Sequence, residues 1–265
     1  MTKIKLVTWN INSVRARIDQ VGQLMEDYNP DVICFQETKV QDHQFPEKYF
    51  TERGYIHHAI AGQKSYNGVA IMSRLPLENI DRRDWCGKGD ARHIEASLPG
   101  GIRLHNFYVP AGGDEPDPAV NDKFAHKLDF LAEMTDWSRG LPKDSKYILV
   151  GDLNIAPYES DVWSHKKLLK VVSHTPLECE KLLTLMKAHD WFDVMRHFVP
   201  EPERLYSWWS YRAKDWRAAD KGRRLDHVWT SPALKDTMHS MEVLEAARAW
   251  VKPSDHAPVM IEFTI

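Results

Sequence analysis

Short apolar stretches of this chain are bordered at five places by carboxylate, amide and imidazole side chains. The five segments are Trp9-Asn10-Ile11-Asn12, Phe35-Gln36-Glu37, Gly151-Asp152-Leu153-Asn154, Leu225-Asp226-His227 and Ser254-Asp255-His256. Oxygen atoms of this kind are the ligands that Mg²⁺, Mn²⁺ and Ca²⁺ prefer, whereas structural zinc sites use a different set. An Asp–His pair orients an imidazole and favours its charged form, which suits the ring to face an anion. Together these side chains predict metal-assisted hydrolysis of a phosphate ester.

Each of the five segments also has a purely structural interpretation. An Asp or Asn beside a strand is, on its own, more often a turn or helix-capping residue. The pair Asp255-His256 is compatible with a turn before a strand. The recurrence at five apolar runs favours the functional interpretation, because loops at strand ends form the ligand sites of α/β sheets. These residues alone predict a phosphate or metal site.

Eight apolar runs rich in β-branched and aromatic residues predict the strands that position these side chains. They are Ile4–Trp9, Val32–Gln36, Val69–Ser73, Ile94–Leu98, Ile102–Tyr108, Tyr147–Gly151, Leu225–Thr230 and Val259–Phe263. Apolar residues at helical spacing predict helices over Arg15–Tyr28, with Ser13 as its cap, and over Ala119–Trp137 and Pro176–Ala188. The mixed order predicts α/β layers with antiparallel pairing. Because no segment has linker composition, we expect one domain over residues 1–265.

Composition narrows the class of protein. The 265 residues are 43% hydrophobic and 28% charged, which excludes a disordered chain, a collagen and a coiled coil. The formal net charge of −3 does not indicate a strongly basic nucleic-acid binder. Cys34, Cys86 and Cys179 are too few and too scattered for a disulfide framework. The chain has neither a signal-peptide pattern nor an apolar run of membrane-spanning length, so we expect a cytoplasmic protein without a membrane partner.

The segment from Arg204 to His227 has a different charge from the rest of the chain. It holds seven basic and three acidic side chains, and six of the ten tryptophans lie between residues 191 and 250. Aromatic residues among Arg and Lys suit a groove that follows a nucleic-acid backbone. The alternative is a solvated charged loop with tryptophans packed beneath it. The residues leave both interpretations open.

Six strings stand in a recognisable order along the chain: TWNIN, DVICFQETK, NGVAIMSR, ILVGDLNIAP, RLDHVWTS and PSDHAPV. Together they resemble the bacterial form of the exonuclease III family of abasic-site DNA endonucleases, within the endonuclease/exonuclease/phosphatase superfamily. The resemblance extends from about residue 4 to residue 263. It implies an α/β fold, a four-layered α/β sandwich in which two packed mixed β-sheets are flanked by helices.

The resemblance also implies which residues hold a metal. Glu37 of the Gln-Glu element would be the principal ligand of Mg²⁺, or of Mn²⁺ as the alternative. Asn10 would lie beside Glu37, and Asp255 would assist at the metal site. Lys39 and Arg92 would help to shape the site.

Five further residues would act on the phosphate if the resemblance holds. Asp152 and Asn154 would position or activate the attacking water. His256, oriented by Asp226, would contact the scissile phosphate and stabilise its developing charge. Tyr108 would donate to that phosphate or lie near the leaving group. Whether Asp152 serves as a base toward water or as an acid toward the leaving oxygen stays open.

The implied substrate pocket would receive a sugar without a base. Trp208 and Leu225 would line it with Trp209 nearby, and the other candidate binding residues are Asn12, Arg212 and Arg223. Two positions depart from the relatives' pattern. Ala111 stands where relatives often carry an amide, and Arg223 stands where some carry an apolar or aromatic residue. Arg223 would make the pocket more open and more polar.

The implied function is metal-dependent hydrolysis of double-stranded DNA 5′ to abasic sites by a monomer. It would leave a 3′-hydroxyl, with 3′→5′ exonuclease and 3′-phosphatase activity at 3′ ends. One alternative is another phosphodiesterase of the superfamily, such as an RNase or a phosphoinositide phosphatase. The other is a non-catalytic nucleic-acid-binding relative, which would be expected to lose one or more of Glu37, Asp152, Asp226 and His256. All four are present. The four acids Glu37, Asp152, Asp226 and Asp255 together contribute more negative charge than the net −3, so the remainder of the chain is slightly basic.

Overall fold

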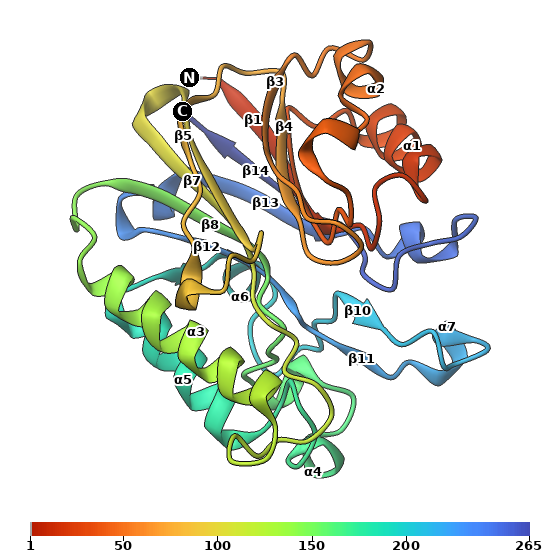
Figure 1. Cartoon of the computed structure of the whole chain (residues 1–265), viewed down its shortest axis with the longest axis vertical. Coiled ribbons are helices and arrows are strands. Elements are labelled where there is room, and N and C mark those ends of the chain that lie inside the picture. Colours follow the sequence, from red (N-terminus) through yellow and green to blue (C-terminus); the bar gives the residue numbers. More distant parts are fainter. Residues whose placement is uncertain (1) are drawn as a thin grey trace.

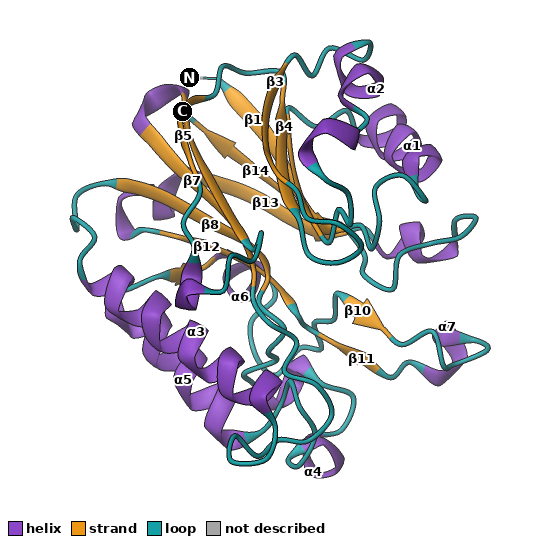
Figure 2. Cartoon of the chain, viewed as in Figure 1, coloured by secondary structure: helices purple, strands orange, loops and turns teal. Residues whose placement is uncertain are grey.

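Two six-stranded β-sheets pack against each other and carry helices on their outer faces (Figures 1 and 2). The computed structural model describes residues 2–265. The strands of the first sheet are β1 (Lys3–Asn10), β2 (Val32–Gln36), β3 (His57–Ala61), β4 (Val69–Ser73), β13 (Met238–Val243) and β14 (Val259–Thr264). Their order is β13-β14-β1-β2-β4-β3, and β1 with β2 is the parallel pair.

The second sheet repeats this arrangement. Its strands are β5 (Glu78–Asp81), β6 (His93–Leu98), β7 (Ile102–Tyr108), β8 (Lys146–Asp152), β9 (Phe192–Asp193) and β12 (Asp226–Thr230). Their order is β5-β6-β7-β8-β12-β9, with β7 and β8 parallel. A separate hairpin pairs β10 (Trp208–Trp209) with β11 (Gly222–Arg223).

Within residues 2–265, seven α-helices connect these strands. They are α1 (Ile18–Tyr28), α2 (Glu47–Thr51), α3 (Asp122–Arg139), α4 (His165–Leu168), α5 (Pro176–Ala188), α6 (Val194–Phe198) and α7 (Trp216–Ala219). Helices α1 and α2 cover the first sheet, whereas α3 and α5 lie side by side on the second (Figure 1). Within residues 2–265, no helix is long and apolar enough to cross a membrane.

Three hydrophobic cores separate the four layers. Alternate residues of a strand face opposite sides of its sheet. In β1, Leu6 belongs to the core between the sheets and Val7 to the core beneath α1. In β8, Val150 faces the first sheet and Leu149 faces α3 and α5. The central strands of both sheets are therefore buried on both faces, and the expected four-layered α/β sandwich is confirmed.

All eight predicted strands are present, with ends within one residue of their expected positions. Six strands were not predicted: β3, β5, β9, β10, β11 and β13. In the two large sheets the missed strands lie at the edges, where fewer side chains are buried and the apolar pattern is weak. Strands β9, β10 and β11 have only two residues each, which is too short for an apolar pattern.

The predicted start of the first helix is wrong. Helix α1 begins at Ile18. Arg17, at the N-cap position before it, makes no side-chain capping hydrogen bond. Ser13 has a left-handed backbone with φ of 88°, and its N–H donates to the carbonyl of Glu37 at 2.7 Å. Ser13 therefore fixes a loop of the polar edge instead of capping the helix.

Candidate active site

The five polar segments meet at one edge of the two sheets, beside a cavity of about 800 Å³. Register explains the convergence. The parallel pair of β1 and β2 ends with Asn10 opposite Gln36, and that of β7 and β8 ends with Tyr108 opposite Asp152. Strand β12 runs the other way and begins with Asp226 opposite Asp152. The ends of four strands and the start of a fifth thus reach the same place.

A hydrogen-bond network joins Glu37 to Asp152. The Nδ2 atom of Asn10 donates to Glu37 Oε1 at 2.9 Å and to Asp152 Oδ2 at 2.8 Å. The Tyr108 hydroxyl donates to Glu37 Oε1 at 2.8 Å, and Lys39 Nζ lies 2.8 Å from Glu37 Oε2. Burial works to raise the pKa of Glu37, but Lys39 and the hydrogen bonds from Asn10 and Tyr108 lower it. Glu37 is therefore an anion at neutral pH.

Four residues of the same loops have left-handed backbone. Asn12, Glu37, Lys39 and Asn154 have φ angles between 48° and 55°, in the left-handed region. Each such residue costs about 1–3 kcal/mol unless its surroundings hold it. The N–H of Lys39, for example, donates to the carbonyl of Asn67 at 2.9 Å. Strain that the surrounding structure maintains at strand ends is typical of a functional site.

His256 lies between two buried carboxylates. Its Nδ1 donates to Asp226 Oδ2 at 2.8 Å, and its Nε2 faces Asp152 Oδ2 at 3.7 Å. Burial disfavours the charged imidazole, but Asp226 and Asp152 raise the pKa of His256 to about 10. Burial raises the pKa of Asp152, and the charge of His256 opposes that rise. The site therefore presents a protonated imidazole beside a carboxylate that accepts protons readily.

Asp255 lies beside this network. Its Oδ1 accepts from Asn12 Nδ2 at 3.2 Å, and its Oδ2 accepts from Trp208 Nε1 at 2.9 Å. Burial would raise the pKa of Asp255, but His256 and these hydrogen bonds lower it. Asp255 is thus an anion that orients Asn12 and Trp208 at the rim of the cavity.

Asn154 and Arg92 fix the loops on either side. Asn154 Nδ2 donates to Asp152 Oδ2 at 3.2 Å and to the carbonyl of Val109 at 2.9 Å. The Arg92 guanidinium pairs with Asp90 at 3.0 Å and lies 5.0 Å from the centre of the Tyr108 ring.

The acidic groups fit a divalent metal ion. Asp152, Asp226 and His256 offer ligand atoms within 4.8 Å of one another. The side-chain amide of Asn10 donates to both Asp152 and Glu37, so Glu37 lies next to this group. Asp226 Oδ1 is buried and has no partner within residues 2–265. Because His256 is protonated, carboxylate and amide oxygens are the available donors, and hard cations prefer these. An ionised Glu37 and an unsatisfied Asp226 oxygen are groups that such an ion would stabilise.

The cavity wall that faces this network is aromatic and basic. Trp208 and Leu225 line it, together with the largely buried Trp209. Arg223 Nη1 donates to Ser173 Oγ at 2.7 Å, and its guanidinium lies 5.2 Å from the centre of the Trp208 ring. Arg223 therefore adds a charged group to the cavity wall.

The basic segment proves to be mixed. Arg224 is fully buried and pairs with Asp161 and Asp193, so it does not face a ligand. Three tryptophans belong to the interior: Trp191 and Trp229 lie in the core beneath α3 and α5, and Trp250 packs on the core beneath α1. Arg224 and these three tryptophans therefore belong to the interior and not to a ligand-facing surface.

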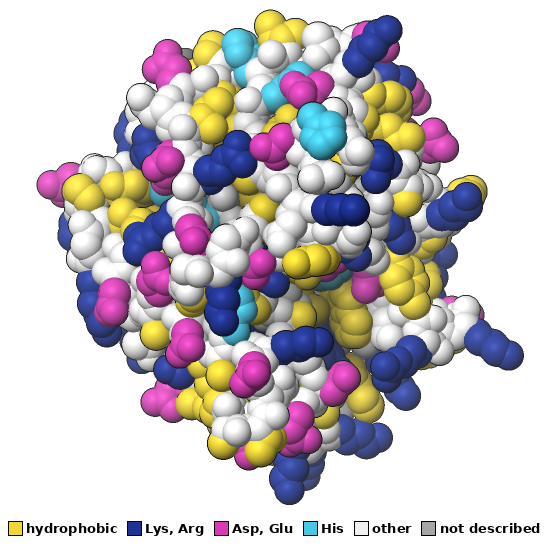
Figure 3. All heavy atoms as spheres, in the orientation of Figure 1, with side chains coloured by type: hydrophobic (Ala, Val, Ile, Leu, Met, Phe, Trp, Pro, Cys, Tyr) yellow, Lys and Arg dark blue, Asp and Glu magenta, His cyan; other side chains and the backbone are white. Residues whose placement is uncertain are grey.

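The remainder of the segment forms the hairpin β10-β11 and helix α7, which project at the right of the view in Figure 1. Arg212, Lys214, Trp216 and Lys221 line the cavity. Figure 3 shows dark blue side chains gathered in this part of the molecule, at the lower right of the view. This face can receive a polyanion.

Sequence reasoning missed Trp163, which also lines the cavity. The amino groups of Lys167 and Lys221 each lie 5.1 Å from the centre of the Trp163 ring. A weak signal was available, because Trp163 is followed closely by three lysines, Lys166, Lys167 and Lys170.

A buried ion pair behind the site was also missed. Lys127 of α3 and Glu178 of α5 are inaccessible to solvent and lie 2.6 Å apart. Lys127 Nζ donates to the carbonyls of Ala111 at 3.3 Å and Asn154 at 2.8 Å. The pair therefore ties the loop after β7 to the loop after β8. The sequence did not predict this pair, because Lys127 lies among apolar residues of its helix and nothing nearby in the sequence indicates that Glu178 of another helix is its partner.

A four-layered sandwich with ionised carboxylates and a protonated imidazole beneath a basic rim defines a phosphoester hydrolase. The chain belongs to the endonuclease/exonuclease/phosphatase family, whose model matches residues 7–256.

Individual relatives match over nearly the whole chain. Exodeoxyribonuclease III of Haemophilus influenzae is 32% identical, with 98% of this chain and 100% of that protein covered. The structure of an AP endonuclease from Archaeoglobus fulgidus superposes with a TM-score of 0.92 and 31% identity, covering 99% of this chain and 100% of that one. A 3′ phosphatase from Neisseria bound to a product DNA hairpin superposes with a TM-score of 0.90, 31% identity and the same coverage.

Proposed function

We propose that the protein is a metal-dependent DNA repair phosphodiesterase that cleaves the backbone 5′ to an abasic site. The products would be a 3′-hydroxyl and a 5′-deoxyribose phosphate. The observation that carries the proposal is the network of Glu37, Asn10, Asp152, Asp226 and His256 at the wall of a cavity with a basic, aromatic rim. The full-length relatives named above include AP endonuclease and exodeoxyribonuclease III enzymes.

Glu37 is the principal metal ligand in this proposal, with Asn10 beside it and Asp255 assisting from the rim. The ion is Mg²⁺, with Mn²⁺ as the alternative, because the available donors are oxygen atoms. When bound, the metal would polarise the phosphate and offset its developing charge. Lys39 holds the Glu37 carboxylate in place through the ion pair at Glu37 Oε2.

Asp152 and Asn154 hold the attacking water, and Asp152 accepts its proton. Burial raises the pKa of Asp152 to about 7, which suits a general base near neutral pH. Protonated His256 donates from Nε2 to a phosphate oxygen while Asp226 keeps the ring charged and oriented. Tyr108 stays protonated, because burial, Glu37 and Asp152 raise its pKa, and its hydroxyl donates to the phosphate or the leaving group.

The cavity would select the substrate by size. An abasic nucleotide costs less to extrude than a normal one, because it has no base to unstack. Trp208 and Leu225 would contact the bare sugar, with Trp209 behind them, while Arg212 and Arg223 of the cavity wall would contact the flanking backbone. Asn12, which donates to Asp255, would contact the same backbone from outside the cavity lining. We propose that residues 1–265 act as one domain and a monomer, in the cytoplasm, on double-stranded DNA with abasic sites or 3′ ends.

The test is incision of a duplex that contains one abasic site. We expect cleavage with Mg²⁺ and none in EDTA, and a 3′ end that a DNA polymerase extends. Glu37→Ala should lose at least 100-fold in kcat, whereas Glu47→Ala on α2 should not change it. Full cleavage in EDTA, or by Glu37→Ala, contradicts the metal-dependent mechanism.

A second activity on 3′-phosphate ends is favoured by Arg223. A guanidinium on the cavity wall can pair with a terminal phosphate, which carries more charge than a diester. Removal of a 3′-phosphate should fall more than abasic-site incision in Arg223→Ala. Equal loss of both activities would show that Arg223 does not distinguish them.

A further inference from the structure

A second cluster of ligand-type side chains lies on the outer face of the second sheet, away from the cavity. His93 and Glu95 alternate on β6 and so point to the same side, and His105 on β7 is the cross-strand partner of Glu95. Trp85 and Trp137 pack against the two imidazoles, with ring centres 5.6 Å from His93 and 4.9 Å from His105. Both histidines are buried, with exposed fractions of 3% and 2%.

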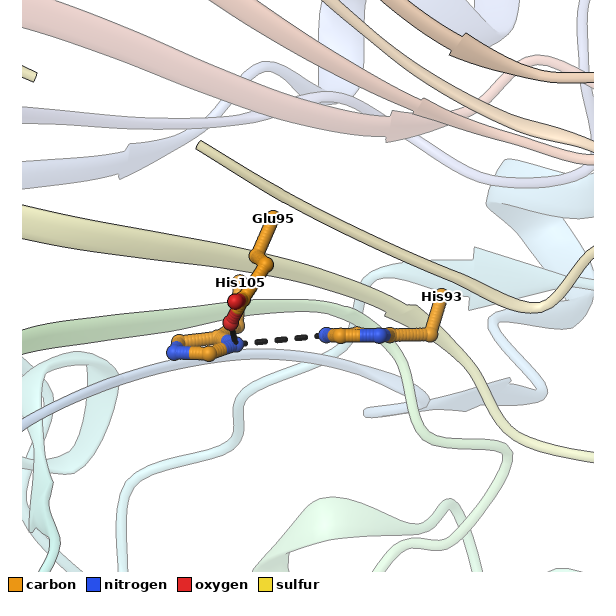
Figure 4. Close-up of side chains that lie close together, drawn as sticks. All are labelled: His93, Glu95 and His105. Carbon is orange, nitrogen blue, oxygen red and sulfur yellow. Dashed lines mark hydrogen bonds and ion pairs between the residues drawn. The ribbon is translucent and has the colours of Figure 1, made fainter. Parts of the chain in front are cut away.

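Three ligand atoms converge in this cluster. His105 Nδ1 lies 2.8 Å from Glu95 Oε2 and 3.2 Å from His93 Nε2, and all three atoms lie within 4.8 Å of one another. Figure 4 shows the two rings side by side, with the Glu95 carboxylate reaching the same His105 nitrogen. Arg103 pairs with Glu95 Oε1, which leaves Oε2 turned toward the imidazoles.

Hydrogen bonds within the cluster leave one ring nitrogen unsatisfied. With the proton on His105 Nδ1, that ring donates to Glu95 Oε2, and His93 Nε2 lies 3.2 Å away as an acceptor. His105 Nε2 is buried and has no partner within residues 2–265. With the ring protons on His93 Nδ1 and His105 Nε2 instead, the lone pairs of His93 Nε2 and His105 Nδ1 are available to a cation beside the Glu95 carboxylate.

Burial lowers the pKa of both imidazoles. The Arg103 charge adds to this effect, whereas Glu95 works to raise the pKa of His105 without reversing the change. Burial works to raise the pKa of Glu95, but His105 and Arg103 lower it. Two neutral imidazoles and an ionised carboxylate are the protonation states in which these residues bind a metal.

We propose that His93, Glu95 and His105 form a transition-metal site that takes Zn²⁺. Two imidazole nitrogens and a carboxylate oxygen are a common zinc ligand set, with water in the fourth position. Bonds of about 2.0–2.1 Å in a tetrahedron require ligand atoms about 3.3 Å apart. The separations of 3.2 and 2.8 Å come close to this value without movement of the strands. The nitrogen ligands distinguish this site from the oxygen donors around Glu37.

The position of the site connects it to the loops of the cavity. His93 follows Arg92, whose carbonyl accepts from the N–H of Tyr108 at 2.8 Å, and Tyr108 is three residues beyond His105. An ion that ties β6 to β7 would therefore steady the strand ends that present Arg92 and Tyr108.

The experiment measures zinc binding by the full-length protein after metal is removed with EDTA. Zn²⁺ is titrated against a chromophoric chelator in excess Mg²⁺, so that the oxygen site is filled. The wild type should take up one equivalent more than Glu95→Gln or His105→Asn, and affinity at this site should fall at least 100-fold in either variant. The control is His58→Asn, because His58 has a Glu47 neighbour at 3.1 Å but no second imidazole, and it should bind as the wild type does.

Two further readouts keep the result interpretable if a variant is poorly folded. Co²⁺ added to the wild type should give the visible absorption of a four-coordinate ion, and Zn²⁺ should abolish it. Zn²⁺ should also raise the melting temperature of the wild type by roughly 5 °C at a hundredfold excess over its dissociation constant. Equal zinc uptake by the wild type and both ligand variants, or no four-coordinate Co²⁺ signal in the wild type, overturns the proposal.

Discussion

Replacing Asp226 by Asn tests whether the charge of His256 matters for catalysis. Asp226 is fully buried and accepts from His256 Nδ1 at 2.8 Å, and the amide keeps the shape and an acceptor oxygen. Without the Asp226 charge, burial works against the charged imidazole, and only Asp152 and Asp255 still favour it. The pKa of His256 should therefore fall from about 10 toward the ordinary value of 6.5. At a pKa of 6.5, roughly one ring in ten is protonated at pH 7.5.

The expected loss has two parts. The smaller protonated fraction costs at least tenfold in kcat, and the weaker hold on the ring orientation brings the total to about 10²–10³-fold at pH 7.5. The tenfold part should return at pH 5.5, because an imidazole of pKa 6.5 is mostly protonated there. Lower pH also protonates Asp152 in both proteins, so the ratio of Asp226→Asn to wild type is the quantity to compare.

The assay is single-turnover incision of an abasic-site duplex at saturating enzyme and Mg²⁺, from pH 5.5 to 8.5. The exposed Asp236→Asn is the matched control and should track the wild type at every pH. Thermal melting checks that Asp226→Asn is folded. A loss below tenfold, or a ratio that does not change with pH, would refute the reasoning that Asp226 acts through the charge of His256.

Three further predictions follow from contacts around the site. Lys127→Met should lower the free energy of unfolding in urea by about 3–5 kcal/mol, because Glu178 stays buried without its partner. The double variant Lys127→Met/Glu178→Leu should recover most of this loss, and no recovery would contradict the ion-pair explanation. EDTA should abolish incision and added Mg²⁺ should restore it, while gel-shift binding to DNA through the basic rim persists in EDTA. Arg212→Gln and Lys221→Gln should each reduce the slope of log affinity against log salt by about 0.9 for duplex DNA, whereas the exposed Lys48→Gln on α2 should leave it unchanged.

The sequence predicts the parts of this fold in which a local pattern reports burial. Strands β2, β4 and β7 are buried on both faces, and their apolar runs predicted both ends correctly. The edge strand β5 has every residue exposed, so no apolar pattern marks it. Ser13 illustrates the other failure, because a residue type that commonly caps helices is held in a loop by Glu37, 24 positions away.

The sequence predicted the chemistry of the site, because polar residues stand at the ends of apolar strands. It did not predict the hydrogen-bond and ion-pair partners of these residues, because the partners depend on how distant strands align. Asp255 contacts Asn12 and Trp208, and Lys127 meets Glu178 across two helices. Sequence identifies which groups are available, whereas tertiary packing decides which carboxylate pairs with which cation.

The net charge of −3 gave a misleading impression of what this surface attracts. Asp152 and Asp226 contribute to that total, but both are buried beside a protonated His256 and present little charge to solvent. Arg224 is also buried, and it forms ion pairs with the two buried aspartates Asp161 and Asp193. The charges that an approaching phosphate meets are those on the rim, at Arg212 and its neighbours. A polyanion is drawn by the local potential of a cleft, so the burial of each charge matters more than the sum over the chain.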